Sequence, residues 1–165
     1  MTVAVRPAHD ADADRVAALL NAINALDGLI PTVPMTAAVV RRDLLGPAPR
    51  ALLRLGTLGG PGGERVVGFA TAATIYDATR CAEILMLLDL YVEPATPRRG
   101  VARALMAALA AEARARGAPA IWWGVDAGDE EALAFYGALG AVVEERFSGL
   151  ILEERALDAL AARAP

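Results

Sequence analysis

The sequence predicts a mixed α/β domain built around a single sheet. Strand-like and helix-like segments alternate through the second half of the chain, and apolar residues elsewhere recur in short periodic runs. The alternation predicts a strand at 84–92, a helix at 100–116, a strand at 120–125 and a helix at 129–139. The 165 residues fit one domain, 1–165, long enough to bury roughly two-thirds of its unfolded surface.

The first half of the chain predicts a strand followed by two helices. Residues 2–6 alternate like a strand, and the helix expected at 10–26 has apolar residues at helical spacing: Val16, Leu19, Leu20 and Ile23. Gly28 is expected to end it. A shorter helix is expected at 36–45, with Thr36 as its N-cap.

A β-hairpin should follow these helices. Its strands are expected at 50–58 and 65–75, and the glycine-rich segment 59–63 is interpreted as a flexible connection between them. The chain is expected to end with a strand at 141–152 and a helical tail at 153–164.

The strand at 84–92 is nearly continuous apolar sequence, which is typical of a central strand covered on both faces. Asp89 interrupts it, and a carboxylate in such a strand is costly unless it is paired or functional. The helix that follows should end at Gly117, where a left-handed C-terminal cap belongs. Of Trp122 and Trp123, one should pack in the core and the other should be partly exposed, because successive strand residues face opposite ways.

Composition excludes several classes of protein. A net charge of −4 argues against a protein whose main partner is nucleic acid. One cysteine and one histidine exclude an intrachain disulfide and make a zinc cage implausible, so no metal is expected. Apolar runs are shorter than the roughly 18 to 20 residues that cross a bilayer, and the start lacks a secretory signal pattern. We therefore expect a soluble, cytoplasmic protein that does not bind membranes.

A turn rich in arginine joins the strand at 84–92 to the next helix. Arg98, Arg99 and Gly100 place cationic side chains and an unhindered backbone where a helix presents unpaired N–H groups, which predicts an anion site suited to a phosphate. Dinucleotide and P-loop fingerprints do not fit, because they need more glycines or a lysine. The alternative is that both arginines are solvated residues at an ordinary helix start.

A second motif, Ala132-x-x-Phe135-Tyr136-x-x-x-Gly140-Ala141, lies in the helix expected at 129–139. Together with the turn, this motif resembles the GCN5-related N-acetyltransferase (GNAT) family, from about residue 3 onward and most clearly over 66–141. Within the family the chain is most similar to spermidine/spermine N-acetyltransferases and their diamine and amino-acid relatives. The motifs that carry this likeness are Val67-Gly68-Phe69-Ala70, Tyr76-Asp77 and Leu88-Asp89-Leu90-Tyr91-Val92.

The resemblance implies a fold, a cofactor and a reaction. The fold has a central, mostly antiparallel sheet, flanked by helices and splayed between its fourth and fifth strands. Acetyl-CoA gives its acetyl group to a primary amine by direct attack in a ternary complex. Its pyrophosphate would bind at Arg98, Arg99, Gly100, Val101, Ala102 and Arg103. Its pantetheine arm would pair with Leu90, Tyr91 and Val92, and Asp129 would help to position that arm.

The resemblance also implies two catalytic residues. Tyr136 stands at the family's general-acid position, where a phenol protonates the departing thiolate. Asp89 is the candidate base that takes a proton from the amine, and Glu83 is a weaker candidate. The alternative is that Asp89 only accepts hydrogen bonds from backbone or arginine donors.

Three departures from the family pattern leave the acceptor open. Pro97 replaces the usual glutamine or arginine, Ala138 replaces a basic residue, and Leu88 replaces a glutamate of the polyamine enzymes. We therefore expect a small amine acceptor, in a negative site formed by Asp27, Asp77 and Asp89 with Leu88 beside them. A homodimer is expected. Alternative functions are a non-catalytic acyl-CoA sensor or interaction module, an acetyltransferase acting on a protein amine, and a nucleotide-binding regulatory domain.

Overall fold

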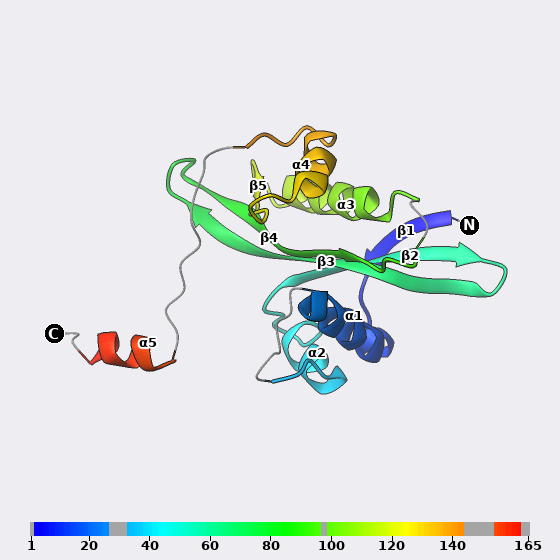
Figure 1. Cartoon of the computed structure of the whole chain (residues 1–165), viewed down its shortest axis with the longest axis horizontal. Helices are drawn as coiled ribbons and strands as arrows, with labels where there is room; N and C mark the ends of the chain where they lie inside the picture. Colours follow the sequence, from blue (N-terminus) through cyan, green and yellow to red (C-terminus); the bar gives the residue numbers. More distant parts are fainter. Residues whose placement is uncertain (1, 27–32, 97–98, 144–153, 163–165) are drawn as a thin grey trace. The chain divides into compact units, whose positions relative to one another are not determined.

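The computed structural model describes residues 2–26, 33–96, 99–143 and 154–162 (Figure 1). The chain divides into two compact units, residues 1–124 and 125–165. Among the described residues, the first unit contains the sheet and four helical segments, and the second contains two short helices. No helix within the described ranges has the length and hydrophobicity needed to cross a membrane.

The first unit is built on a five-stranded sheet in the order β1-β2-β3-β4-β5. The first four strands pair antiparallel with their neighbours, and β5 pairs parallel to β4. Together with the flanking helices, this confirms the mixed α/β fold class. The strands are β1 (Thr2–Pro7), β2 (Leu52–Gly60), β3 (Gly63–Asp77), β4 (Ala82–Val92) and β5 (Ile121–Trp122).

Helices cover both faces of this sheet (Figure 1). One face carries η1 (Asp10–Asp12), α1 (Ala13–Leu26) and α2 (Ala37–Asp43), and the other carries α3 (Val101–Ala115). Under α1 and α2 lies the main core, which includes Val16, Val40, Leu55, Phe69 and Tyr91. Under α3 lies a smaller cluster, which includes Leu85, Ala113 and Ala118.

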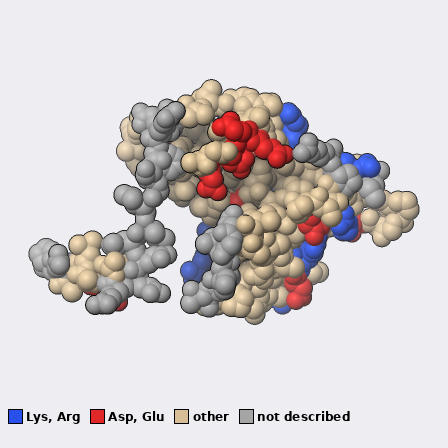
Figure 2. Space-filling model, viewed as in Figure 1, with Lys and Arg blue, Asp and Glu red and all other residues tan. Residues whose placement is uncertain are grey.

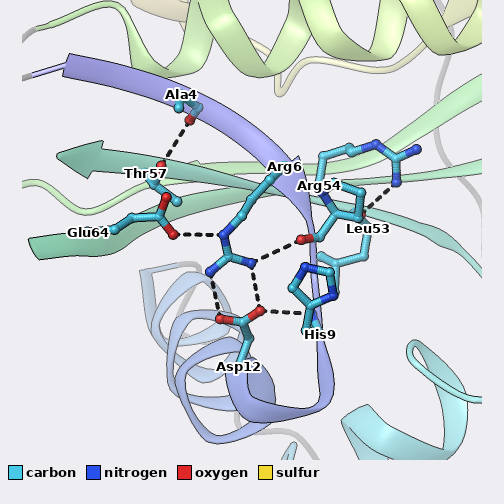
Figure 3. Close-up of polar contacts among 9 residues, drawn as sticks. Ala4, Arg6, His9, Asp12, Leu53, Arg54, Thr57 and Glu64 are labelled. Carbon is cyan, nitrogen blue, oxygen red and sulfur yellow. Dashed lines mark hydrogen bonds and ion pairs between the residues drawn. The ribbon is translucent and has the colours of Figure 1, made fainter.

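Local capping signals place the helix ends close to their predicted positions. The Thr36 hydroxyl accepts a hydrogen bond from the N–H of Val39 at 3.3 Å, as an N-cap should. Gly117 adopts φ 73° just after α3, which confirms the predicted left-handed cap. The helix predicted at 10–26 begins instead with the 3-10 turn η1, whose Asp12 accepts hydrogen bonds from Arg6 and from the N–H of His9 (Figure 3).

The glycine-rich hairpin connection is shorter than predicted. Gly60 and Gly63 still pair across the ladder, so only Pro61 and Gly62 form the turn. The prediction of a flexible segment over 59–63 was wrong in extent, because glycine content indicates a loop while cross-strand pairing extends both strands into it. Gly63, at φ 97°, has a backbone conformation that other residues rarely adopt.

The end of the sheet also departs from the sequence prediction. The strand predicted at 120–125 is only Ile121–Trp122, and Trp122 and Trp123 are both half-buried, so neither is the fully buried core residue that alternation predicted. Of the strand predicted at 141–152, residues 141–143 have no regular structure and the rest lies outside the described residues. The second unit contains α4 (Glu130–Gly137) and α5 (Glu154–Ala161), and α5 lies within the predicted helical tail.

Candidate functional site

The pairing of β4 with β3 decides which face of the sheet Asp89 occupies. Ala72 pairs with Leu87, but the next residue of β3, Thr71, pairs with Asp89, so Leu88 is an extra residue that forms a bulge. One extra residue reverses the alternation of side chains beyond it. Asp89 therefore lies on the face opposite to that of Leu87.

The face that Asp89 reaches is the one covered by α1 and α2. Phe69 and Tyr91 pair directly across β3 and β4, two residues beyond Thr71 and Asp89, and both belong to the core under α1 and α2. Leu85 lies instead in the cluster under α3. Unbroken alternation from Leu85 would have put Asp89 under α3. The bulge at Leu88 therefore moves this carboxylate to the opposite face of the sheet.

Asp89 is half-buried and has a specific hydrogen-bond donor. The hydroxyl of Thr71 donates to Oδ2 of Asp89, and Thr71 itself is only 3% exposed. Among the residues that the structure describes, no arginine or backbone N–H donates to Asp89, and its Oδ1 accepts no hydrogen bond. One carboxylate oxygen is thus held by the sheet, and the other is available to a further partner.

The end of β4 offers a free backbone edge beside Asp89. Within the described ranges, β5 pairs with β4 only at Leu85 and Met86, whereas β3 pairs with β4 as far as Val92. The two strands therefore separate after Met86, as the predicted splay requires. The predicted pantetheine-binding residues Leu90, Tyr91 and Val92 lie on this separated part of β4.

The N-terminus of α3 has the features of an anion site. Gly100 is the N-cap at φ 81°, no side chain caps the helix, and the first intrahelical bond runs from the N–H of Ala104 to the carbonyl of Gly100 at 2.9 Å. The N–H groups of Val101, Ala102 and Arg103 come before that bond and have no carbonyl partner in the helix. A Cβ at Gly100 would meet no atom within 4 Å, so the backbone is open to a ligand.

Charge and burial around this N-terminus also suit an anion. The side chains of Arg99 and Arg103 are exposed, while Val101 is buried and anchors the start of α3. Arg98 and Pro97 lie outside the described residues. Thr96, which motif reasoning missed, is 9% exposed, and its buried hydroxyl has no partner in the described part of the chain. Thr96 is identified by its buried hydroxyl that lacks a hydrogen-bond partner, and burial and partners can be read only from the structure.

In the second unit, Tyr136 lies in the last turn of α4. Its ring contacts that of Phe135 in an edge-on arrangement with centroids 5.0 Å apart. Partial burial raises the pKa of Tyr136 above its ordinary value, and the negative charge of Asp129 adds to this effect. The phenol is therefore protonated at neutral pH, as a proton donor must be.

Asp129 has a structural contact that explains its position. Its carboxylate accepts a hydrogen bond from the N–H of Ala132 at 2.9 Å and so caps the N-terminus of α4. Figure 2 shows acidic side chains grouped over α4, in whose first turn Glu130 and Glu131 lie. Negative charge at this helix end also complements the helix dipole.

Asp77, a predicted acceptor-site residue, does not lie near Asp89. Asp77 accepts hydrogen bonds from the N–H groups of Thr79 and Arg80 and from the Arg80 guanidinium, whose contact lowers the pKa of Asp77. Asp77 pairs with Ala82 at the far end of the β3–β4 ladder, which separates it from Asp89 by roughly 20 Å along the strand. The weaker base candidate, Glu83, is exposed near that same far end.

Two further acceptor-site predictions concern Leu88 and Asp27. Leu88 is 48% exposed at the bulge next to Asp89, so the structure does bring this pair together. Asp27 lies outside the described residues. Of the predicted acceptor-site residues that the structure describes, Leu88 and Asp89 are therefore adjacent, and Asp77 is remote from both.

Comparisons with known proteins point to one family. The family model of the acetyltransferase (GNAT) family matches residues 39–141. No match was found among curated proteins. An integron cassette protein from the mobile metagenome of V. cholerae has a similar structure, with a TM-score of 0.76, 17% identity and 98% of each chain covered.

Two enzymes are also structurally similar. An aminoglycoside acetyltransferase from an uncultured soil metagenomic sample, in complex with trehalose, gives a TM-score of 0.74 at 16% identity, covering 93% of this chain and 97% of that one. A ribosomal-protein-alanine N-acetyltransferase from Brucella melitensis biovar Abortus 2308 gives a TM-score of 0.71 at 21% identity. The alignment covers 91% of this chain and 99% of that one. At these identities the likeness shows the fold.

Proposed function

Because this chain belongs to the acetyltransferase (GNAT) family, we propose that it transfers an acetyl group from acetyl-CoA to a primary amine of a small molecule. The family match makes the chain an N-acetyltransferase, and enzymes of this family use acetyl-CoA. That match, over 39–141, carries the proposal, because it spans the separated end of β4, the Gly100 turn and the Tyr136 helix. It also crosses the boundary between the two units, so we propose that residues 1–165 form one domain.

The residues at the N-terminus of α3 fit the pyrophosphate of acetyl-CoA. The N–H groups of Val101, Ala102 and Arg103 and the positive end of the helix dipole would hold the anion. The exposed Arg99 and Arg103, together with Arg98, would add cationic contacts. The orphaned hydroxyl of Thr96 lies just before this turn and favours a segment whose polar groups are completed by a ligand.

The separated end of β4 fits the pantetheine arm. Leu90, Tyr91 and Val92 present backbone N–H and C=O groups on the side away from β3, where an extended chain with amide groups can pair like an added strand. Acetyl-CoA bound in this way supplies an activated thioester carbonyl. Asp129 would then contribute indirectly, by fixing the start of the helix that carries Tyr136.

In a ternary complex the amine attacks acetyl-CoA directly, with Asp89 as the proposed base and Tyr136 as the proposed acid. An alkylammonium is mostly protonated at pH 7, so the amine must lose a proton before its lone pair can attack the carbonyl. Asp89 accepts that proton, directly or through water. The carbon–nitrogen bond forms, the carbon–sulfur bond breaks, and Tyr136 gives its phenolic proton to the departing thiolate. The nitrogen then loses its second proton, which restores the Tyr136 phenol directly or through water and leaves the neutral amide.

The acceptor is proposed to be a small cationic amine such as a diamine or an amino acid. Asp89 supplies a negative charge on the face under α1 and α2, and the spermidine/spermine-like motif 88–92 supports this subgroup. Leu88, exposed where polyamine enzymes have a glutamate, favours a smaller amine than a true polyamine. Asp27 remains a proposed contributor. Asp77 is the weakest one, because the β3–β4 turn already occupies its carboxylate.

An acceptor panel tests this proposal. CoA release is measured with acetyl-CoA and four classes of acceptor: diamines, amino acids, aminoglycosides and peptides with a free N-terminus. Turnover is expected on small amines. Turnover only on peptides would favour a protein amine as acceptor, which is what the name of the Brucella neighbour describes. Calorimetric binding of acetyl-CoA without turnover on any amine would favour a non-catalytic sensor.

We also propose that the enzyme works in the cytoplasm as a homodimer. The apolar residues of α5 support an interface between copies, since Leu157 and Leu160 are 50% and 57% exposed. Light scattering after size exclusion, at several protein concentrations, is expected to give twice the mass of one chain. A monomer at every concentration would contradict this.

A further inference from the structure

Thr71 of β3 is a buried polar residue beside the proposed base. It lies directly opposite Asp89, is 3% exposed, and its hydroxyl donates to Oδ2 of Asp89. The resemblance to known motifs assigned Thr71 no role. We propose that Thr71 is a positioning residue, whose hydroxyl holds the Asp89 carboxylate so that Oδ1 faces the amine.

The surroundings of Asp89 make this single hydroxyl important. On the same face of the sheet, the cross-strand pairs on either side are Phe69 with Tyr91 and Ala73 with Met86. None of these four side chains donates a hydrogen bond to Asp89, and Thr71 is the one residue in the described ranges that does. Without the Thr71 hydroxyl, no described residue would donate a hydrogen bond to the carboxylate or fix its orientation.

The geometry of Thr71 suits it to this task. A β-branched side chain has few accessible χ1 rotamers in a strand, so its hydroxyl is already oriented before it binds. A hydrogen bond to a charged acceptor is also stronger than one between neutral groups. Because the bulge at Leu88 brings Asp89 into register with Thr71, the same irregularity that re-aims the base also gives it its partner.

This inference rests on the proposed function, in which Asp89 accepts the proton of the attacking amine. Proton transfer depends steeply on how a base is aligned, so a carboxylate free to rotate would accept the proton less often. The proton would go from the amine nitrogen to Oδ1, while Oδ2 keeps its bond to Thr71. Loss of the hydroxyl should therefore lower kcat and leave acetyl-CoA binding unchanged.

The test compares Thr71→Val, which replaces the hydroxyl by a methyl group of similar size, with Thr71→Ser, which keeps the hydroxyl. We expect Thr71→Val to lower kcat by about 10-fold, with the KM for acetyl-CoA changed by less than about 2-fold. Thr71→Ser should restore most of the lost turnover. Thr57→Val is the matched control, because Thr57 is fully buried and its hydroxyl donates to the carbonyl of Ala4 (Figure 3). Its kcat should equal that of the wild type even if its Tm falls.

Asp89→Asn separates this inference from the proposed function. If Asp89→Asn lowers kcat strongly but measurably and Thr71→Val lowers it no further in that background, Thr71 acts through Asp89. If Asp89→Asn abolishes turnover but Thr71→Val has wild-type kcat, the positioning role is wrong and the base assignment stands. If Asp89→Asn keeps wild-type turnover, the base assignment itself fails. Should Thr71→Val not fold, Thr71→Ala replaces it, and equal kcat for the Ala and Ser variants would overturn the positioning role.

Discussion

At the scale of single residues, the carboxylates of Asp12 and Asp89 differ in how many of their oxygens accept hydrogen bonds. Asp12 accepts two hydrogen bonds from the Arg6 guanidinium and one from the N–H of His9, and these contacts lower its pKa (Figure 3). Among the residues that the structure describes, Thr71 is the one that donates to Asp89, which leaves one carboxylate oxygen available. Asp12 therefore stabilises the fold, whereas Asp89 can take part in chemistry.

Tyr136→Phe tests the proposed general acid. Loss of the Tyr136 hydroxyl should lower kcat by roughly 10²-fold, because the leaving thiolate loses its proton donor. Affinity for acetyl-CoA, measured by calorimetry, should stay close to wild type. Phe135→Leu is the neighbouring control, since it alters the adjoining ring without removing a hydroxyl, and it should keep most of the activity. Unchanged kcat in Tyr136→Phe would remove this residue from the mechanism.

Asp12→Asn should reveal the pH dependence of the Arg6 contact. Because the folded-state pKa of Asp12 is lowered, its contribution to stability is complete above the ordinary pKa of about 3.9 and is lost as pH falls through the folded value. The Tm difference between wild type and variant should therefore be largest near pH 7 and shrink below about pH 4. Asp10→Asn, in an exposed pair with Arg41, should have little effect at either pH. A Tm difference that does not change with pH would contradict this account.

At the scale of elements, glycine sets how closely α3 and β4 approach their neighbours. A Cβ at Gly56 of β2 would lie 2.5 Å from Cγ1 of Val101, the first residue of α3. A Cβ at Gly68 of β3 would lie 2.5 Å from the carbonyl oxygen of Tyr91 in β4. The start of α3 and the end of β4 are thus both packed against glycine.

Gly56→Ala should displace the start of α3. The added methyl group overpacks against Val101 and should cost about 1 to 3 kcal/mol of folding free energy, with weaker binding of acetyl-CoA as the helix N-terminus moves. Gly62→Ala is the matched control, because a Cβ there meets nothing within 4 Å. Denaturant unfolding and calorimetry measure the two effects. Wild-type stability and affinity in Gly56→Ala would show that Val101 does not set the position of the helix.

Elements also show where sequence patterns succeed and fail. The ends of α2 and α3 could be predicted, because the cap at Thr36 and the left-handed Gly117 act over a few residues. Local patterns could not predict that the hairpin turn is only Pro61 and Gly62, or that β5 is only two residues long. Both depend on which strands pair, and pairing joins residues far apart in the chain.

At the scale of the whole molecule, the family match over 39–141 includes residues of both compact units. The first unit contains Asp89 and the start of α3, and the second contains Tyr136. The proposed reaction needs residues of both, so a single domain follows from the proposed function.

Acetyl-CoA should therefore stabilise both units together. Trp122 and Trp123 lie in the first unit, so their fluorescence follows its unfolding, while hydrogen exchange of the α4 amides follows the second unit. We expect acetyl-CoA at about 100 times its Kd to raise the free energy of unfolding by about 2.7 kcal/mol as seen by both probes. Stabilisation of the first unit alone would contradict a single domain.

The candidate site was predicted in part. Asp89, Tyr136 and the Gly100 turn could be named from motifs, and their catalytic and binding roles stay predictions. Thr71 and Thr96 could not be named, because a threonine in a strand or turn has no distinctive pattern, and only burial and hydrogen bonding single them out. Asp77 matched a motif, yet the structure places it at the remote end of the β3–β4 ladder.

The fold class, most of the helices and the family motifs follow from chemistry that acts locally along the chain: apolar periodicity, caps and short spacings. The face on which Asp89 lies does not follow from such chemistry. Alternation along β4 would place Asp89 under α3, and the bulge at Leu88 places it under α1 and α2, opposite Thr71. Register between two strands is set by the packing of both, so only the tertiary structure decides which residues surround the proposed base.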